Sequence, residues 1–194
     1  MTSNIASDHI LKMAEEAAGR AVKVKGSVSK KKKERWLTVK SFSLVLIGSA
    51  EVSRDDKRKM TSVVFTAEGW PSPFNVQIDS KAKLLAKGGG EKSFLVTGTL
   101  VELKEGEKVL KLETVFMLET LTGVVEVKET KKGKKTGATL VVENGKGKIH
   151  YLLILDAKGS EIMETLEDAT LEVVGIATGR GTKRGLRVIQ FKKA

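Results

Sequence analysis

The chain repeats itself with a period of about 75 residues, and this repeat limits what it can fold into more than any other feature. The interval from Asp79 to Gly98 returns unchanged between Asp156 and Gly175. A fixed period of this kind indicates that each copy is one folding unit. The matching segments are 48–52 and 123–127, 74–78 and 151–155, and 94–98 and 171–175.

A partial third copy opens the chain. Asp8 begins a predicted helix at 8–18, and strands are predicted at 21–29 and 36–42. This is only the second half of the pattern. A helix and two strands leave sheet edges unpaired, so we expect this segment to pack on the middle copy. Three alternatives stay open here: completion by another chain, loose order, or an N-terminal extension whose likeness to the repeat is accidental.

Hydrophobic periodicity predicts the same order of elements in both complete copies. Ser160 is predicted to cap the helix of the last copy, in which apolar residues recur at spacings of three and four. The elements expected in the middle copy are strands at 46–52, 61–66 and 74–78, a helix at 80–87, and strands at 93–103 and 109–117. Those expected in the last copy are strands at 123–127, 138–143 and 149–155, the helix, and strands at 171–177 and 186–192.

Three strands, a helix and two further strands form the order of the OB-fold, a five-stranded Greek-key barrel. The chain therefore resembles the OB-fold proteins of single-stranded nucleic-acid metabolism, most nearly the archaeal replication protein A-like proteins. The resemblance is architectural and covers nearly the whole chain. It implies an all-β fold with short helices, built as tandem OB-fold barrels. The expected parts are an N-terminal half-unit at 1–43 and complete units at 44–118 and 119–194.

Composition removes several classes of chemistry. The chain has no Cys and two His, so disulfides, thiolate sites and His-based metal or acid–base pairs are not expected. With no nucleophile placed beside a base, we predict a non-enzyme without cofactor or metal. No apolar run reaches the length of a membrane span, so we expect no membrane partner and a cytoplasmic location. Abundant Lys and Glu with few amides indicate a thermophilic, archaeal source.

The formal net charge of +11 favours polyanionic partners. An oligonucleotide on an OB-fold lies across strands two and three, between the loops that join strands one to two and four to five. These loops hold the basic runs, although a lysine-rich thermophile surface is an alternative reading. The nearly balanced loop at 102–108 is not expected to touch phosphate. The predicted phosphate contacts are Lys30, Lys31, Lys32, Lys33, Arg35, Arg54, Lys57, Arg58, Lys59, Lys131, Lys132, Lys134, Lys135, Arg180, Lys183 and Arg184.

Base contacts are fewer, because aromatic residues make up 5% of the chain. Trp70 lies in a proline-containing turn, where we expect it to be accessible and to stack on a base; burial as a joint between copies is the alternative. Trp36 could stack or join copies equally well. Asn75 and Gln77 alternate with apolar neighbours and should face outward toward bases. The remaining aromatics considered, which are in phase with the core, are Phe65, Phe74, Tyr151 and Phe191.

The last copy carries Leu152 and Ile154 at the positions that match Asn75 and Gln77. An apolar outer face suggests a protein partner or self-association through this copy. Two functions follow. The first is sequence-tolerant binding of single-stranded DNA or RNA through basic loops. The second is a structural or assembly subunit of a ribonucleoprotein or replication complex that binds structured RNA and protein.

Overall fold

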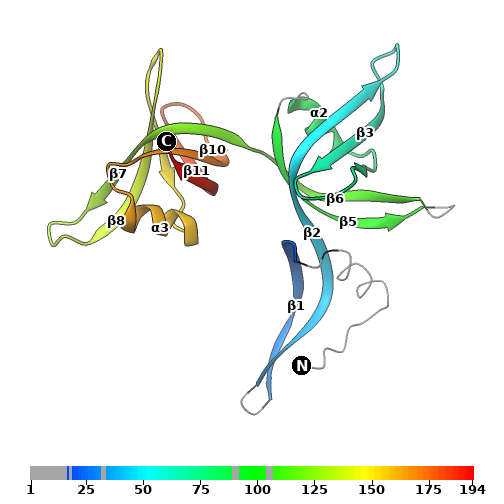
Figure 1. Cartoon of the computed structure of the whole chain (residues 1–194), viewed down its shortest axis with the longest axis horizontal. Helices are drawn as coiled ribbons and strands as arrows, with labels where there is room; N and C mark the ends of the chain where they lie inside the picture. Colours follow the sequence, from blue (N-terminus) through cyan, green and yellow to red (C-terminus); the bar gives the residue numbers. More distant parts are fainter. Residues whose placement is uncertain (1–16, 18, 32–33, 89–91, 104–106) are drawn as a thin grey trace. The chain divides into compact units, whose positions relative to one another are not determined.

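The computed structural model describes residues 17, 19–31, 34–88, 92–103 and 107–194 (Figure 1). The chain divides into two compact units, Met1–Met117 and Leu118–Ala194. Strands dominate both units, and two short helices lie among the described residues. The expected fold class, all-β with short helices and OB-like barrels, is confirmed. The helix expected at 8–18 falls almost entirely outside the described residues.

The second unit is a closed barrel of five strands. Neighbouring strands follow the order β10-β11-β9-β8-β7, and β10 pairs with β7 to close the circle. Only the β9–β11 pair is parallel. This is the strand order of the OB-fold. The elements are β7 (Glu119–Glu129), β8 (Lys135–Asn144), β9 (Gly147–Leu153), α3 (Ala157–Thr165), β10 (Thr170–Thr178) and β11 (Lys183–Lys193).

The first unit has the same order, with a shorter closure. Its strands are hydrogen-bonded in the order β4-β3-β2-β5-β6. A single parallel bridge between Val76 and Leu110 joins the two ends, where unit 2 has a ladder between β9 and β11. The N–H of Gln77 donates to the carbonyl of Leu110 at 3.0 Å. The elements are β2 (Glu34–Arg54), β3 (Met60–Ala67), β4 (Phe74–Asn75), α2 (Ala82–Gly88), β5 (Ser93–Glu102) and β6 (Lys108–Met117).

The strand β2 is unusually long because it pairs with different strands along its two halves. Its first half pairs with β1 (Val22–Lys31), and its second half pairs with β3 and β5 (Figure 1). Phe42, Leu44 and Leu46 alternate along it and are all buried, so no turn interrupts the ladder. The boundary expected between residues 43 and 44 therefore falls inside β2.

Three hairpins of the chain share one irregularity at a glycine. The register shifts immediately before Gly26 in β1–β2, Gly98 in β5–β6 and Gly175 in β10–β11. At each glycine a Cβ would collide with a carbonyl of the partner strand; it would lie 2.6 Å from the oxygen of Lys111 at Gly98, and 2.6 Å from that of Arg187 at Gly175. The β1–β2 hairpin thus reproduces the bulge of the other two hairpins.

The repeated aspartates begin the helices. Asp156 accepts a hydrogen bond from the N–H of Gly159 at 3.3 Å, and Asp79 accepts one from the N–H of Ala82 at 2.9 Å. The prediction that Ser160 caps the last helix is wrong, because Ser160 lies inside α3. The backbone of Asp156 is extended, which lets its carboxylate reach the first free N–H groups of the helix.

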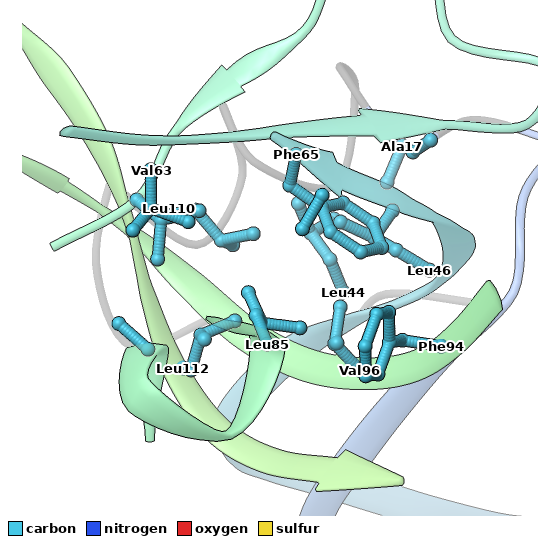
Figure 2. Packing of buried hydrophobic residues seen from close by; sticks show 14 of the residues in the cluster. Ala17, Leu44, Leu46, Val63, Phe65, Leu85, Phe94, Val96, Leu110 and Leu112 are labelled. Carbon is cyan, nitrogen blue, oxygen red and sulfur yellow. The ribbon is translucent and has the colours of Figure 1, made fainter. Parts of the chain in front are cut away.

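Each barrel has its own apolar core. In unit 1 Phe65 of β3 and Phe94 of β5 are fully buried in the core, to which α2 contributes Leu85 (Figure 2). In unit 2 Ile162 of α3 holds the corresponding place. Burying such a side chain stabilises the fold by about 1.5 to 3 kcal/mol. The four aromatics expected in the core are confirmed there: Phe65 and Tyr151 are buried, and Phe74 and Phe191 pack against the two clusters.

Candidate nucleic-acid interface

The outer face of β8 and β9 is the surface that an OB-fold offers to an oligonucleotide. Tyr151 points into the core and is 3% exposed, so its neighbours His150 and Leu152 point outward. Leu152 pairs with Thr139 across the strands and is 59% exposed. We call Thr139, His150 and Leu152 the β8–β9 face. The expected outward orientation of Leu152 and Ile154 is confirmed.

The β10–β11 loop brings positive charge to this face. The N–H of His150 donates to the carbonyl of Thr182 at 2.9 Å, and Lys183 is the register partner of His150. These contacts place the beginning of β11 beside the middle of β9. The result is a pocket of 370 Å³, of a size that ordinary ligand sites have. Its lining residues are Thr139, His150, Leu152, Lys183, Arg184 and Gly185.

Arg184 is held in place by three contacts. Its Nε donates to the carbonyl of Gly181 at 3.0 Å, and its Nη1 donates to the hydroxyl of Tyr151 at 3.3 Å. The guanidinium carbon also lies 5.6 Å from the centroid of the Tyr151 ring. Because the side chain is already ordered, it would lose less entropy on contacting an anion. Lys183 and Arg180 are exposed on the same loop region.

The β7–β8 loop displays three lysines. Thr130 and Lys134 close a tight turn: the N–H of Thr130 donates to the carbonyl of Lys134 at 2.9 Å, and the N–H of Lys134 donates to Oγ1 of Thr130 at 3.1 Å. Gly133 takes a left-handed conformation at φ 73°. The exposed side chains that this turn presents are those of Lys131, Lys132 and Lys134.

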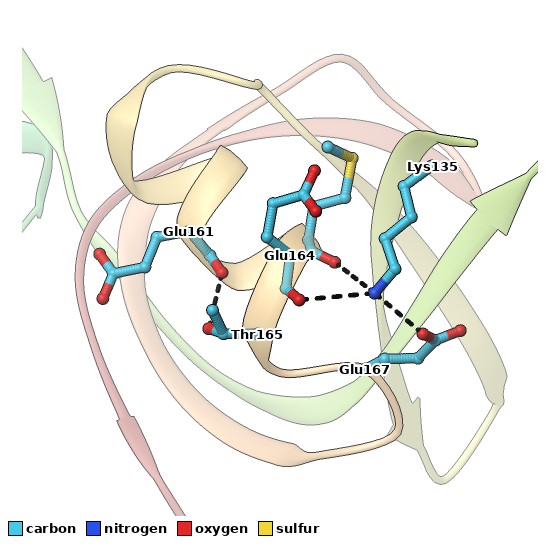
Figure 3. Close-up of polar contacts among 6 residues, drawn as sticks. Lys135, Glu161, Glu164, Thr165 and Glu167 are labelled. Carbon is cyan, nitrogen blue, oxygen red and sulfur yellow. Dashed lines mark hydrogen bonds and ion pairs between the residues drawn. The ribbon is translucent and has the colours of Figure 1, made fainter. Parts of the chain in front are cut away.

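Lys135 differs from its neighbours in the basic run. Its Nζ donates to the carbonyls of Met163 and Glu164 at 3.3 and 3.5 Å and pairs with Glu167 at 3.1 Å (Figure 3). Its side chain is 22% exposed. A cation at the last carbonyls of a helix stabilises that helix. In this structure Lys135 therefore fastens α3 to the barrel, and its charge is engaged within the protein.

Among its described residues, the corresponding face of unit 1 has mixed charge, with exposed Glu107 beside exposed Lys108. Asn75 and Gln77 are exposed there, as expected from their alternation. The amide of Asn75 donates to Oε1 of Glu107 at 3.2 Å. The two hairpin ladders match Leu110 with Leu186. Glu107 therefore occupies the position that Lys183 holds in unit 2, and Lys108 occupies the position of Arg184.

The β2–β3 hairpin of unit 1 nevertheless projects cations. Its tip is ordered by local bonds: Nη1 of Arg54 donates to the carbonyl of Arg58 at 3.2 Å, and the N–H of Lys59 donates to Oδ1 of Asp55 at 2.7 Å. Arg58 adopts φ 60°, which the turn imposes. The exposed basic residues of this hairpin are Arg54, Lys57, Arg58 and Lys59.

The basic residues of the β1–β2 hairpin are described only in part. Lys30 and Arg35 pair with each other in the ladder and are exposed. Lys32 and Lys33 lie outside the described residues. Lys31 and Trp36 lie on β1 and β2, but their side chains are not among those described, so the proposed role of Trp36 stays a prediction.

Trp70 is half-buried and packs against the core of unit 1. Its ring meets Phe74 edge-on, with centroids 5.0 Å apart, and carries Arg20 3.9 Å above its centroid. We expected an accessible ring; the structure instead shows a ring covered on one face. Ala17, just before β1, belongs to the same core cluster, so the described residues ahead of β1 pack on the unit 1 barrel.

Sequence reasoning missed two residues of the β8–β9 face, Thr139 and His150. The signal for His150 was available, because the alternation that buries Tyr151 turns His150 outward. Thr139 is turned outward in the same way by the buried Ala138 and Leu140 on either side of it. Among the residues that the structure describes, no group of three or more His, Asp or Glu side chains is placed to hold a metal ion. Neither described helix is long and apolar enough to cross a membrane.

Comparison with known proteins gives little beyond the fold. No protein-family model and no curated protein matches the chain. Two similar solved structures are of the single-stranded DNA binding protein from Thermus aquaticus. A deletion mutant shares 12% identity over 90% of this chain and 91% of that chain, with a TM-score of 0.25. The wild-type protein shares 12% identity over 78% of this chain and 92% of that chain, also with a TM-score of 0.25. At these values the likeness carries no argument, and the OB-like fold is assigned from the strand order.

Proposed function

We propose that the chain binds single-stranded nucleic acid across the β8–β9 face of unit 2. The observation that carries this proposal is the pocket in which His150 and Leu152 lie beside Lys183 and Arg184. An aromatic ring and an apolar side chain can each receive the face of a base, and the two cations can receive the flanking phosphates. This combination suits a strand whose bases are free to turn toward the protein.

The lysines of the β7–β8 loop extend the same interface. In the OB-fold, the loops joining strands one to two and four to five flank the binding face. Here they supply Lys131, Lys132 and Lys134 on one side and Arg180 and Lys183 on the other, all exposed. Loop cations contact phosphates without reading bases, so binding is tolerant of sequence. The basic residues of the β1–β2 and β2–β3 hairpins add contacts to longer strands.

A second function, assembly within a ribonucleoprotein or replication complex, is favoured by one observation. Leu152, Ile154 and Leu155 are 59%, 37% and 42% exposed along one stretch. Neighbouring exposed apolar residues of this kind often mark a contact with another protein. In that function the basic loops hold structured RNA, and the apolar stretch holds a protein or a second copy of the chain.

The test compares matched lysine substitutions in the full chain. Affinity for single-stranded DNA, single-stranded RNA and a folded RNA is measured at two salt concentrations for wild type, Lys183→Ala and Lys192→Ala. Lys192 is the control because it removes the same charge, yet pairs with Glu172 at 2.9 Å on the barrel wall. Lys183→Ala should weaken single-strand binding and lower the log–log salt slope by about 0.7, the value of one phosphate contact.

Two results would contradict the proposal. The first is equal weakening by both substitutions, because only the summed charge would then matter. The second is a preference for folded RNA over both single strands that Lys183→Ala leaves unchanged. That second result, together with self-association lost in Leu152→Ser, would favour the assembly function.

A further inference from the structure

Unit 1 contains a pocket beside α2. It shares no lining residue with the pocket at the β8–β9 face of unit 2. The unit 1 pocket has a volume of 410 Å³ and lies between the tip of the β2–β3 hairpin and the outer side of α2. We call it the α2 pocket. Its lining residues are Arg54, Arg58, Lys59, Met60, Lys83, Ala86 and Lys87.

Among the described residues, no carboxylate lines the α2 pocket beside its five cations. Within the described ranges, no carboxylate forms an ion pair with Arg54, Arg58, Lys59, Lys83 or Lys87. Two acids, Asp55 and Asp56, lie in the same turn, and neither lines the pocket. Asp55 uses Oδ1 to accept the backbone N–H of Lys59. Like charges gathered around one hollow repel one another. An anion from outside the protein would relieve that repulsion.

At the matching position of unit 2, a lysine forms an ion pair within the protein. Arg54 and Met60 are the last partners of the β2–β3 ladder, after a bulge, and Glu129 and Lys135 are the last partners of the β7–β8 ladder, after the same bulge. There Lys135 bonds to Glu167 and to two carbonyls at the end of α3 (Figure 3). The repeat interval from Asp79 to Asp156 also places Glu164 where unit 1 has Lys87.

The two units have therefore exchanged charge at two sites. Unit 2 is basic on the strand face through Lys183, where unit 1 has Glu107. Unit 1 is basic beside its helix, where unit 2 closes the space with an internal ion pair. In unit 1 this arrangement gathers two arginines and three lysines around one pocket beside α2.

From this exchange we infer that the α2 pocket is a binding site for a ligand carrying two or more adjacent phosphates. Guanidinium groups bind phosphate oxygens in a bidentate manner, and lysines add point charges that can serve several oxygens. Two arginines and three lysines around one pocket exceed what a single phosphate needs. The ligand is either the backbone of a nucleic-acid strand or a free oligophosphate; both offer the same chemistry.

The experiment uses the full chain and inorganic tripolyphosphate as the probe, measured by calorimetry. The test variant is Lys83→Ala with Lys87→Ala, both exposed on α2, where alanine favours the helix. The matched control is Lys25→Ala with Lys111→Ala, which removes the same charge from exposed strand positions of unit 1. The α2 variant should weaken tripolyphosphate binding at least about tenfold, and the control should change it little.

A second variant guards against a folding artefact. Lys87→Glu installs the acid that unit 2 carries at this position and should weaken tripolyphosphate binding further, while the chain still melts cooperatively. Because Lys87 lies in the last turn of α2, a small fall in the melting temperature is expected. Equal weakening by test and control variants, or a wild type that does not bind tripolyphosphate, would overturn the assignment.

A parallel titration with a long single-stranded DNA identifies the source of the phosphates. If the α2 variant weakens both ligands, the pocket holds the nucleic-acid backbone; if it weakens tripolyphosphate alone, the pocket holds a free oligophosphate. The β8–β9 face lies in the other unit, so its role is tested separately by Lys183→Ala. Either proposal can therefore fail while the other stands.

Discussion

The guanidinium of Arg20 lies 3.9 Å from the centroid of the Trp70 ring, and its Nη2 donates a hydrogen bond to the carbonyl of Gly69 at 3.1 Å. Arg20 precedes β1, whereas Trp70 lies in the turn between β3 and β4. The pair therefore ties the beginning of the described chain to the unit 1 barrel. It also occupies the ring face on which a base would have stacked.

Removing that cation should uncover the indole. In a Trp36→Phe background, which leaves Trp70 as the fluorophore, Arg20→Ala should raise acrylamide quenching. It should also lower the free energy of unfolding by about 0.5 to 1 kcal/mol, the value of an exposed cation–π contact. Arg180→Ala, which removes an exposed arginine of unit 2, should change neither quantity. Quenching that stays at the wild-type level after loss of Arg20 would show that the ring is covered by something else.

Trp70 itself should contribute to stability as well as to any binding. Because the ring is half-buried against the core and Phe74, Trp70→Ala should cost an amount near the lower end of about 3 to 5 kcal/mol. Urea denaturation measures this cost, and single-strand affinity corrected for the folded fraction measures stacking separately. If the variant were as stable as wild type, the Trp70 ring would be accessible, as its turn sequence suggests.

Neighbouring lysines of one basic run should behave differently. Lys135→Ala removes the ion pair to Glu167 and two bonds to the end of α3, so it should destabilise unit 2 by about 1 kcal/mol. Lys134→Ala, on the exposed turn, should leave stability unchanged and weaken nucleic-acid binding. Thermal melting and salt-dependent binding of the two variants decide the matter. The reverse pattern would mean that Lys135 reaches the ligand and Lys134 does not.

The repeat predicted most of the fold because it marks the positions where local backbone geometry requires a particular residue type. Asp79 and Asp156 recur because each caps a helix, and Gly98 and Gly175 recur because each meets a carbonyl of the next strand. Such requirements depend on local geometry and so are visible in the chain itself. The prediction for Ser160 was wrong because serine is also a good capping residue, and this one lies four positions after the true cap, Asp156.

The candidate site was less predictable, because contacts across the barrel decide it. Nothing in a run of lysines shows that Lys135 is the one that reaches the end of α3. Lys83 and Lys87 come to lie beside Arg54 and Arg58 only through the packing of α2 against the β2–β3 hairpin, which the sequence does not reveal. Alternation along β9 turns His150 outward, but only the register between β9 and β11 shows that Lys183 lies beside it.

The glycine of the bulge gives a stability test with an internal control. A Cβ at Gly175 would lie 2.6 Å from the carbonyl of Arg187, while at Gly137 of β8 it would meet nothing within 4 Å. Gly175→Ala should therefore destabilise unit 2 by about 1 to 3 kcal/mol as the hairpin moves apart. Gly137→Ala should be neutral or slightly stabilising. If both cost the same in denaturant titrations, the bulge is not fixed by close approach.

His150 is the residue on which we expect single-strand binding to depend most in unit 2. It points outward from β9, lines the pocket with Leu152 and Lys183, and has its backbone fixed by the bond to Thr182. Because the backbone of His150 is already ordered, its ring can stack on a base with little further ordering of the chain. His150→Ala should therefore weaken single-strand binding by about 1 to 3 kcal/mol. Because stacking needs only an aromatic face, His150→Phe should restore most of that affinity, whereas a role as a hydrogen-bond donor would leave the phenylalanine variant as weak as alanine.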